Sequence, residues 1–277
     1  MKPLISFGPF TLHLFGLMIA IGAAVGIFLF IREAKKREMN HQVLLDVAVY
    51  SLVGGVIGAR LVYVFIYNPI FYLANPIEIL FIHQGGLSIH GGIIGGLLAG
   101  YLLLKRRQIP VWKSLDLVAP ALILAQGISR IGCDVFGMPV SSNFPLGIEV
   151  NGEYLHPAQA YEFTLNFILF GYLWLRLKRT AYSGQVFLHY FIGFMIIRAI
   201  VEFSRINPII FGPFTVSHLM SLIGIIVGLV LINYRKKEEV VKKGRFMTIN
   251  KSDVIKVALV VVALILSSLL LYYGVQG

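Results

Sequence analysis

The sequence predicts an all-α protein, a polytopic transmembrane helical bundle of seven core spans and an additional C-terminal span. Three observations predict it: the composition, apolar segments of membrane-spanning length, and basic loops at alternate turns of the chain. Of the 277 residues, 57% are hydrophobic and 13% are charged, whereas soluble domains have about 45–50% apolar and about 25% charged residues. So little charge could not cover a soluble surface, and the apolar excess must therefore face lipid.

The apolar segments have the length that a membrane span requires. A helix crosses the hydrocarbon core with about 20 apolar residues. Candidate spans are residues 11–31, 44–67, 86–104, 115–131, 158–175, 185–203, 214–233 and 254–273. We therefore expect a transmembrane domain over residues 1–235, a basic cytoplasmic linker over residues 236–253 and an additional helix over residues 254–277.

The loops predict the orientation. Lys and Arg cluster after the first, third, fifth and seventh spans, whereas loops 68–85 and 132–157 contain neither residue. Because basic loops stay in the cytoplasm, the N-terminus is expected outside and the first span uncleaved. The same loops account for the net charge of +11 without a nucleic-acid partner.

Several classes of site are not expected. The single cysteine, Cys133, excludes an internal disulfide. The chain has no P-loop, dinucleotide-binding turn or serine triad, and no histidine pair with the helical spacing of a metal site. We therefore expect neither a metal nor another cofactor.

Four arginines remain after the cytoplasmic clusters are set aside, and the topology places all of them toward the outer face. They are Arg60, Arg130, Arg198 and Arg205. An arginine near the middle of a bilayer costs about 2.5–3.5 kcal/mol on insertion scales, and such residues are usually paired or functional.

Two carboxylates are positioned to pair with these arginines. Glu202 lies four residues after Arg198 and three before Arg205, on one helix face, and Glu162 begins the fifth span. Purely structural pairing is one interpretation. However, two acids neutralise at most two arginines, so a net positive cluster should remain. Guanidinium groups fork onto phosphate oxygens, so the sharper hypothesis is a pocket for a phospholipid headgroup in the outer leaflet.

A histidine surrounded by glycines lies at the same depth. The run from Gly85 to Gly92 contains His90, followed by Gly91 and Gly92. Histidine is the usual proton acceptor near neutral pH, and the glycines allow a ligand or another segment to approach the backbone. The alternative is a histidine hydrogen-bonded inside the bundle.

Two further patterns have simpler interpretations. Glycines at helical spacing, such as Gly54 with Gly58, indicate close packing of helices. The pentapeptide FGPFT occurs at 7–11 and 211–215. A Gly-Pro turn flanked by phenylalanines suits the membrane interface, and five residues are too few to indicate duplication.

Six motifs in order resemble the signatures of the prolipoprotein diacylglyceryl transferases. They are LFGLMIAIG at 14–22, GGVIGARLVYV at 54–64, GGLSIHGG at 85–92, SRIGCDVFG at 129–137, HPAQAYE at 156–162 and RAIVEFSR at 198–205. The order and spacing match over about the first 230 residues, which is far more specific than any single motif.

The resemblance implies an enzyme of the bacterial cytoplasmic (inner) membrane with its active site toward the outer leaflet. Such an enzyme moves the diacylglyceryl group of phosphatidylglycerol to the lipobox cysteine of a prolipoprotein signal peptide, releasing glycerol phosphate. The implied catalytic residues are His90, Arg130, Arg198 and Arg205. Substrate binding is expected from Arg60, Tyr63, Glu202, Gly91, Gly92, Asp134 and Glu162.

The chain also departs from the family pattern. Phe15 stands where tyrosine is usual, and residues 133–138, from Cys133 to Met138, replace an Asn-x-x-Asn-Gly-Glu run. These departures leave open a paralogue with another lipid donor or acceptor. A lipid or anion transporter with the arginines as its binding site is a further alternative, and a noncatalytic scaffold would leave the four arginines unexplained.

Overall fold

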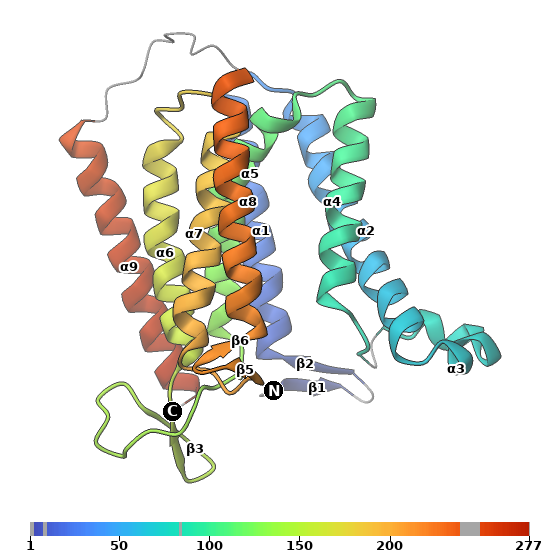
Figure 1. Ribbon diagram of the computed structural model, residues 1–277, viewed down its shortest axis with the longest axis vertical. Coiled ribbons are helices and arrows are strands. Elements are labelled where there is room, and N and C mark those ends of the chain that lie inside the picture. The colour runs from blue at the N-terminus through green and yellow to red at the C-terminus, as the bar shows by residue number, and fades with distance from the viewer. Residues whose placement is uncertain (1–2, 8–9, 83–84, 239–249, 277) are drawn as a thin grey trace. The chain divides into compact units, whose positions relative to one another are not determined.

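The computed structural model describes residues 3–7, 10–82, 85–238 and 250–276, and most of them are helical (Figure 1). The chain divides into two compact units. The first comprises Met1–Phe30 with Leu115–Gly277, and the second comprises Ile31–Ser114.

The first unit is a helical bundle. Its helices are α1 (Leu14–Lys36, as far as Phe30), α5 (Val111–Ile131, from Leu115), α6 (Ala158–Arg176), α7 (Gln185–Glu202), α8 (Val216–Glu238) and α9 (Lys251–Gln276). Helix α6 lies between α7 and α9, and α7 packs against α8 (Figure 1). The C-terminal ends of α5 and α7 lie at the same end of the unit as the N-terminal ends of α6 and α8 (Figure 1). We call this end of the unit the site end.

The second unit is built on one close helix pair. It contains α2 (His41–Tyr67), α3 (Pro69–Ala74), the 3-10 turn η1 (Pro76–Leu80) and α4 (Ile89–Arg106). A Cβ atom added to Gly58 would collide with the backbone of Gly91, and one added to Gly54 would collide with Gly95. The prediction that regularly spaced glycines pack helices closely is confirmed for this pair.

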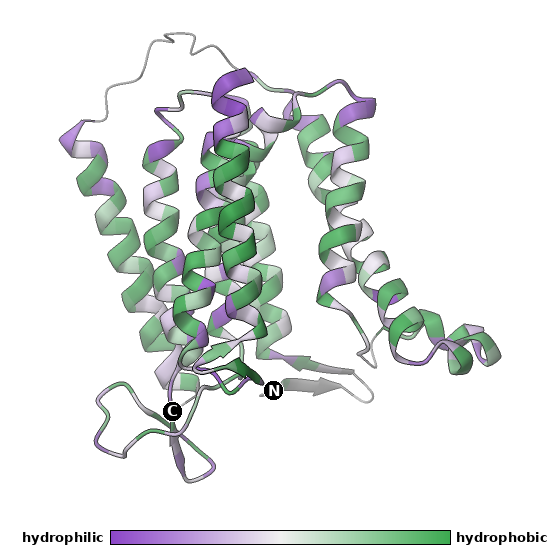
Figure 2. Ribbon diagram, viewed as in Figure 1, coloured by the Kyte–Doolittle hydropathy of each residue, from purple (hydrophilic) through white to green (hydrophobic). Residues whose placement is uncertain are grey.

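A helix is present at each predicted span, and the protein is an all-α polytopic membrane protein. Among the described residues, six helices are long and apolar enough to cross a bilayer: α1, α2, α5, α7, α8 and α9. Helices α4 and α6 also occupy predicted spans but fall outside that set. Hydrophobic residues make up most of the length of the helices, and hydrophilic residues gather toward the helix ends (Figure 2).

The described part of the chain contains three short antiparallel hairpins, which were not predicted. They pair β1 (Pro3–Phe7) with β2 (Phe10–His13), β3 (Ile148–Val150) with β4 (Glu153–Leu155), and β5 (Ile209–Phe211) with β6 (Phe214–Thr215). The second FGPFT copy forms the β5–β6 turn, where Gly212 has φ +55°, and leads directly into α8. The strands of β1–β2 likewise precede α1, although residues 8 and 9 of the first copy lie outside the described residues. Most of the predicted basic linker, residues 239–249, also lies outside them.

Candidate active site at the site end of the bundle

Arg130 and Glu162 form the first ion pair of the site end. Arg130 lies in the last turn of α5, and Glu162 lies four residues into α6. The Arg130 Nε donates to Glu162 Oε1 at 2.9 Å. The Glu162 side chain is only 3% exposed, whereas that of Arg130 is 28% exposed, so part of the Arg130 side chain stays accessible.

Arg198 and Glu202 form the second ion pair, one turn apart on α7. The Arg198 Nη2 lies 2.6 Å from Glu202 Oε2 and also donates to Ser217 Oγ at 3.2 Å. The Glu202 side chain is fully buried. A buried carboxylate is tolerated only when charged and hydrogen-bonding partners compensate its lost hydration.

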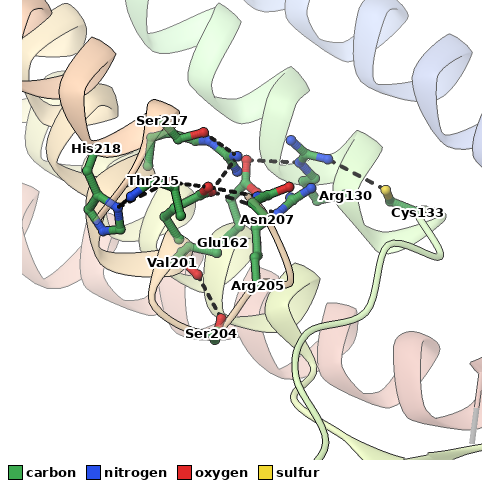
Figure 3. Close-up of polar contacts among 12 residues, drawn as sticks. Arg130, Cys133, Glu162, Val201, Ser204, Arg205, Asn207, Thr215, Ser217 and His218 are labelled. Carbon is green, nitrogen blue, oxygen red and sulfur yellow. Dashed lines mark hydrogen bonds and ion pairs between the residues drawn. The ribbon is translucent and has the colours of Figure 1, made fainter. Parts of the chain in front are cut away.

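Neutral donors supply the rest of that compensation. Glu202 Oε1 accepts hydrogen bonds from Asn207 Nδ2 at 2.7 Å and from Thr215 Oγ1 at 2.8 Å. The backbone N–H of Thr215 donates in turn to His218 Nδ1 at 3.1 Å. These contacts join the end of α7 to the start of α8 in one polar network (Figure 3).

Arg205 is the third guanidinium of the cluster. It lies just after α7, with its Nε 4.0 Å from Glu202 Oε2. Burial lowers the pKa of Arg205, and the positive charges of Arg198 and Arg130 lower it further, whereas Glu162 and Glu202 oppose the shift. Among the ion pairs that the described residues form here, three guanidiniums share two carboxylates. Arg60, the fourth arginine of the predicted cluster, belongs to the second unit.

In the segment after α5, Cys133 stands where the resemblance led us to expect an asparagine. The Arg130 Nη1 lies 3.5 Å from Cys133 Sγ, which accepts a weak hydrogen bond. The Cys133 carbonyl accepts a hydrogen bond from Gln159 Nε2 at 3.0 Å. Asp134, a predicted substrate-binding residue, is half-buried in this same segment.

Backbone pairing fixes the rest of the segment. The N–H groups of Gly137 and Met138 donate to the carbonyls of His156 and Ser204, at 2.9 and 2.8 Å. Met138, at the position of the expected glutamate, thus takes part through its backbone, and its side chain is 40% exposed.

The structure brings together five of the residues singled out in the sequence: Arg130, Glu162, Arg198, Glu202 and Arg205. Sequence reasoning did not predict the neutral partners Thr215, Ser217, Asn207 and Gln159. The FGPFT repeat was the one available signal for Thr215, because it marked residue 215 as part of a distinct structural feature. Asn207 and Ser217 lie in no motif that could have indicated them.

Arg60 belongs to the second unit and is buried against the loop after η1. Its guanidinium donates to four backbone carbonyls, those of Glu78, Ile79, Gly85 and Gly86, at 2.6–2.9 Å. It also lies 5.8 Å from the ring centroid of Tyr63. In this structure Arg60 holds the backbone of η1 and of the residues just before α4, and the expected contact of Arg60 and Tyr63 with a headgroup stays a prediction.

His90, Gly91 and Gly92 form the first turn of α4 in the second unit. Ser88 caps this helix by accepting from the N–H of Gly91. His90 is exposed, whereas Gly91 is buried and faces α2. A Cβ added to Gly92 would make only ordinary contacts with Ala59 and Gly55. The backbone approach expected at these glycines is thus made by α2, and their role toward substrate stays a prediction.

The fold and the charges define the class of protein. It is a polytopic helical membrane protein whose buried carboxylates hold several arginines in a net-cationic cluster. Such a cluster is suited to an anionic group, because forked guanidinium donors match phosphate oxygens in charge and geometry.

The chain belongs to the prolipoprotein diacylglyceryl transferase family. The family model matches residues 2–234. The chain is similar to proteins named phosphatidylglycerol–prolipoprotein diacylglyceryl transferase from Halalkalibacterium halodurans, at 33% identity over 83% of this chain and 84% of the relative. It is 37% identical to the protein of that name from Clostridium botulinum strain Langeland, over 84% of this chain and 96% of the relative. It is also 35% identical to that of Clostridioides difficile, over 81% and 91%.

Proposed function

We propose that this protein transfers the diacylglyceryl group of phosphatidylglycerol to the thiol of the lipobox cysteine of a prolipoprotein, releasing glycerol phosphate. The family and the names of the relatives support this activity. The structural observation that carries it is the excess of guanidinium over carboxylate charge around Arg130, Arg198 and Arg205, because the substrate and the leaving group are both phosphate esters.

The proposed chemistry is a displacement at a glycerol carbon. The thiol sulfur forms a bond to that carbon while the carbon–oxygen bond to phosphate breaks, and the electron pair leaves with the phosphate. The thiol proton passes to His90 as general base. Arg130, with Arg198 or Arg205, stabilises the charge that grows on the leaving phosphate, which is usually the largest single contribution to such catalysis.

The remaining site residues have supporting roles. Glu162 and Glu202 hold the arginines in place, and Arg60 holds the backbone of Gly85 and Gly86, just before the helix that carries His90. Tyr63, Gly91, Gly92 and Asp134 are proposed substrate contacts. The partners are phosphatidylglycerol and a prolipoprotein signal peptide, in the bacterial cytoplasmic membrane, with the N-terminus outside and the site facing the outer leaflet.

Reconstitution tests this function. The purified protein in phosphatidylglycerol liposomes, with a lipobox peptide, should yield a diacylglyceryl thioether detectable by mass spectrometry. Arg130→Ala and His90→Ala should each abolish the product, whereas Arg106→Ala, at an exposed position in the last turn of α4, should not. Full activity of either site variant would remove that residue from the chemistry. Lipid movement across the liposome without any covalent product would favour a transporter.

A further inference from the structure

Helix α9 lies beyond the residues that the family model matches, yet it packs directly on α6. The match ends at residue 234, and α9 spans Lys251–Gln276. Gly171 of α6 allows the close approach, because a Cβ added there would meet Val261 of α9 at 2.8 Å. An ion pair of 3.0 Å joins Lys178, just after α6, to Asp253 in the first turn of α9. The two helices are antiparallel, so the last turns of α9 reach the site end (Figure 1).

Tyr272 is the residue through which α9 enters the core at that end. Its side chain has no exposed surface, and its ring packs edge-on against Phe163, with the ring centroids 5.9 Å apart. Its hydroxyl donates to Gln159 Oε1 at 3.1 Å. Elsewhere α9 presents mainly apolar side chains to its surroundings, and Tyr272 and Ser268 are the buried residues among those described on this helix.

Gln159 connects Tyr272 to the segment after α5, which contains Cys133 and contacts Arg130. While its Oε1 accepts from Tyr272, its Nε2 donates to the Cys133 carbonyl at 3.0 Å. Cys133 Sγ accepts from Arg130 Nη1, and Arg130 is also paired with Glu162, three residues after Gln159 on α6. The Gln159 amide is only 2% exposed, so the Tyr272 hydroxyl fixes which way the amide points and thereby which end of it faces Cys133.

We propose that Tyr272 is a positioning residue for the active site, acting through Gln159 and the Cys133 carbonyl to hold Arg130. Helix α9 is then a built-in part of the catalytic bundle and more than a membrane anchor. The inference rests on the proposed function as far as Arg130 is concerned. Its structural half, that α9 orders the segment after α5, does not depend on that function.

The single cysteine gives a test that does not need activity. Cys133 is 4% exposed and is the only thiol in the chain. In the full-length protein in detergent, Tyr272→Phe should raise the rate of Cys133 alkylation by N-ethylmaleimide about 2- to 12-fold, the range expected when one net hydrogen bond is lost. Tyr273→Phe is the matched control, because it removes a hydroxyl one residue away that donates to the Leu146 carbonyl at 2.8 Å. It should leave the alkylation rate unchanged.

Kinetics test the link to Arg130. Tyr272→Phe should lower kcat about 2- to 12-fold and leave the KM for phosphatidylglycerol within about twofold, because the contribution of Arg130 is made in the transition state. In a Gln159→Met background, Tyr272→Phe should have no further effect on kcat or on alkylation, since the relay is already cut.

The outcomes separate the two proposals. Equal alkylation rates and equal kcat for Tyr272→Phe and the wild type would overturn the inference, and so would equal changes in Tyr273→Phe. If the wild-type protein itself forms no thioether, the proposed function fails, while the alkylation rates still decide whether α9 orders the Cys133 segment.

Discussion

Arg130 and Glu162 form an unequal pair, in which the glutamate side chain is buried and the arginine side chain is partly exposed. Their Nε and Oε1 atoms lie 2.9 Å apart, with side-chain exposures of 28% and 3%. The buried Glu162 therefore orients Arg130, and part of the arginine side chain stays accessible to a ligand. Glu202 has the same relation to Arg198, with exposures of 0% and 21%.

Glu162→Gln tests this orienting role. The amide keeps the shape of the side chain but loses the charge that holds Arg130, which should reduce the stability of the protein by about 1–3 kcal/mol. It should also lower the rate of thioether formation at least about tenfold, the equivalent of about 1.4 kcal/mol, measured by the peptide assay. Glu149→Gln, at an exposed position in β3, is the control. Equal rates for the two variants would show that Glu162 does not orient Arg130.

Thr215→Val should destabilise the junction of α7 and α8. Its hydroxyl donates to the buried Glu202 Oε1, and removal leaves that carboxylate oxygen with one donor fewer, at a cost of about 1–3 kcal/mol. Thermal unfolding in detergent measures the loss as a lowered Tm. Thr215→Ser keeps the hydroxyl and should keep most of the stability. A Tm for the valine variant as high as that of the serine variant would contradict the assignment.

Gly86→Ala should disturb the loop that Arg60 orders. Gly86 has φ +73°, and a Cβ there would lie 2.5 Å from Arg60 Nη1 and 2.7 Å from the Tyr63 ring. Gly85 has φ +90° but nothing within 4 Å of such a Cβ, so Gly85→Ala carries only the backbone strain, about 1 kcal/mol. Hydrogen exchange of residues 76–82 and 85–88 should accelerate more in Gly86→Ala than in Gly85→Ala. Equal exchange would mean that Arg60 does not hold this loop.

Gly91→Ala should weaken the α2–α4 pair. The added methyl group would collide with the Gly58 carbonyl and with Val62, and overpacking of this kind costs about 1–3 kcal/mol. The expected result is a lower Tm, with faster hydrogen exchange in both helices. Gly274→Ala, in α9, where nothing lies within 4 Å, should leave the Tm unchanged or slightly raised. If Gly91→Ala leaves the Tm and the hydrogen exchange unchanged, this glycine is not required for helix packing, and its predicted role toward substrate would remain.

The membrane class and the helix positions follow from the sequence, which also singled out the five charged residues of the site end, although it grouped Arg60 with them. These follow from local rules: a span needs about 20 apolar residues, and an arginine within a span is usually paired or functional. The pairing of Glu202 with Arg198 was also predictable, because a spacing of four places both residues on one helix face.

The long-range contacts of the site and the three hairpins depend on the tertiary structure. Glu162 meets Arg130, Thr215 meets Glu202, and Tyr272 meets Gln159 across separations of 32, 13 and 113 residues, and no local pattern specifies such contacts. The three hairpins were missed for a related reason, since strands of two to five residues carry too little periodicity to be read from sequence. Arg60 was identified from the cost of a buried charge, yet only the folded loop showed that backbone carbonyls offset that cost.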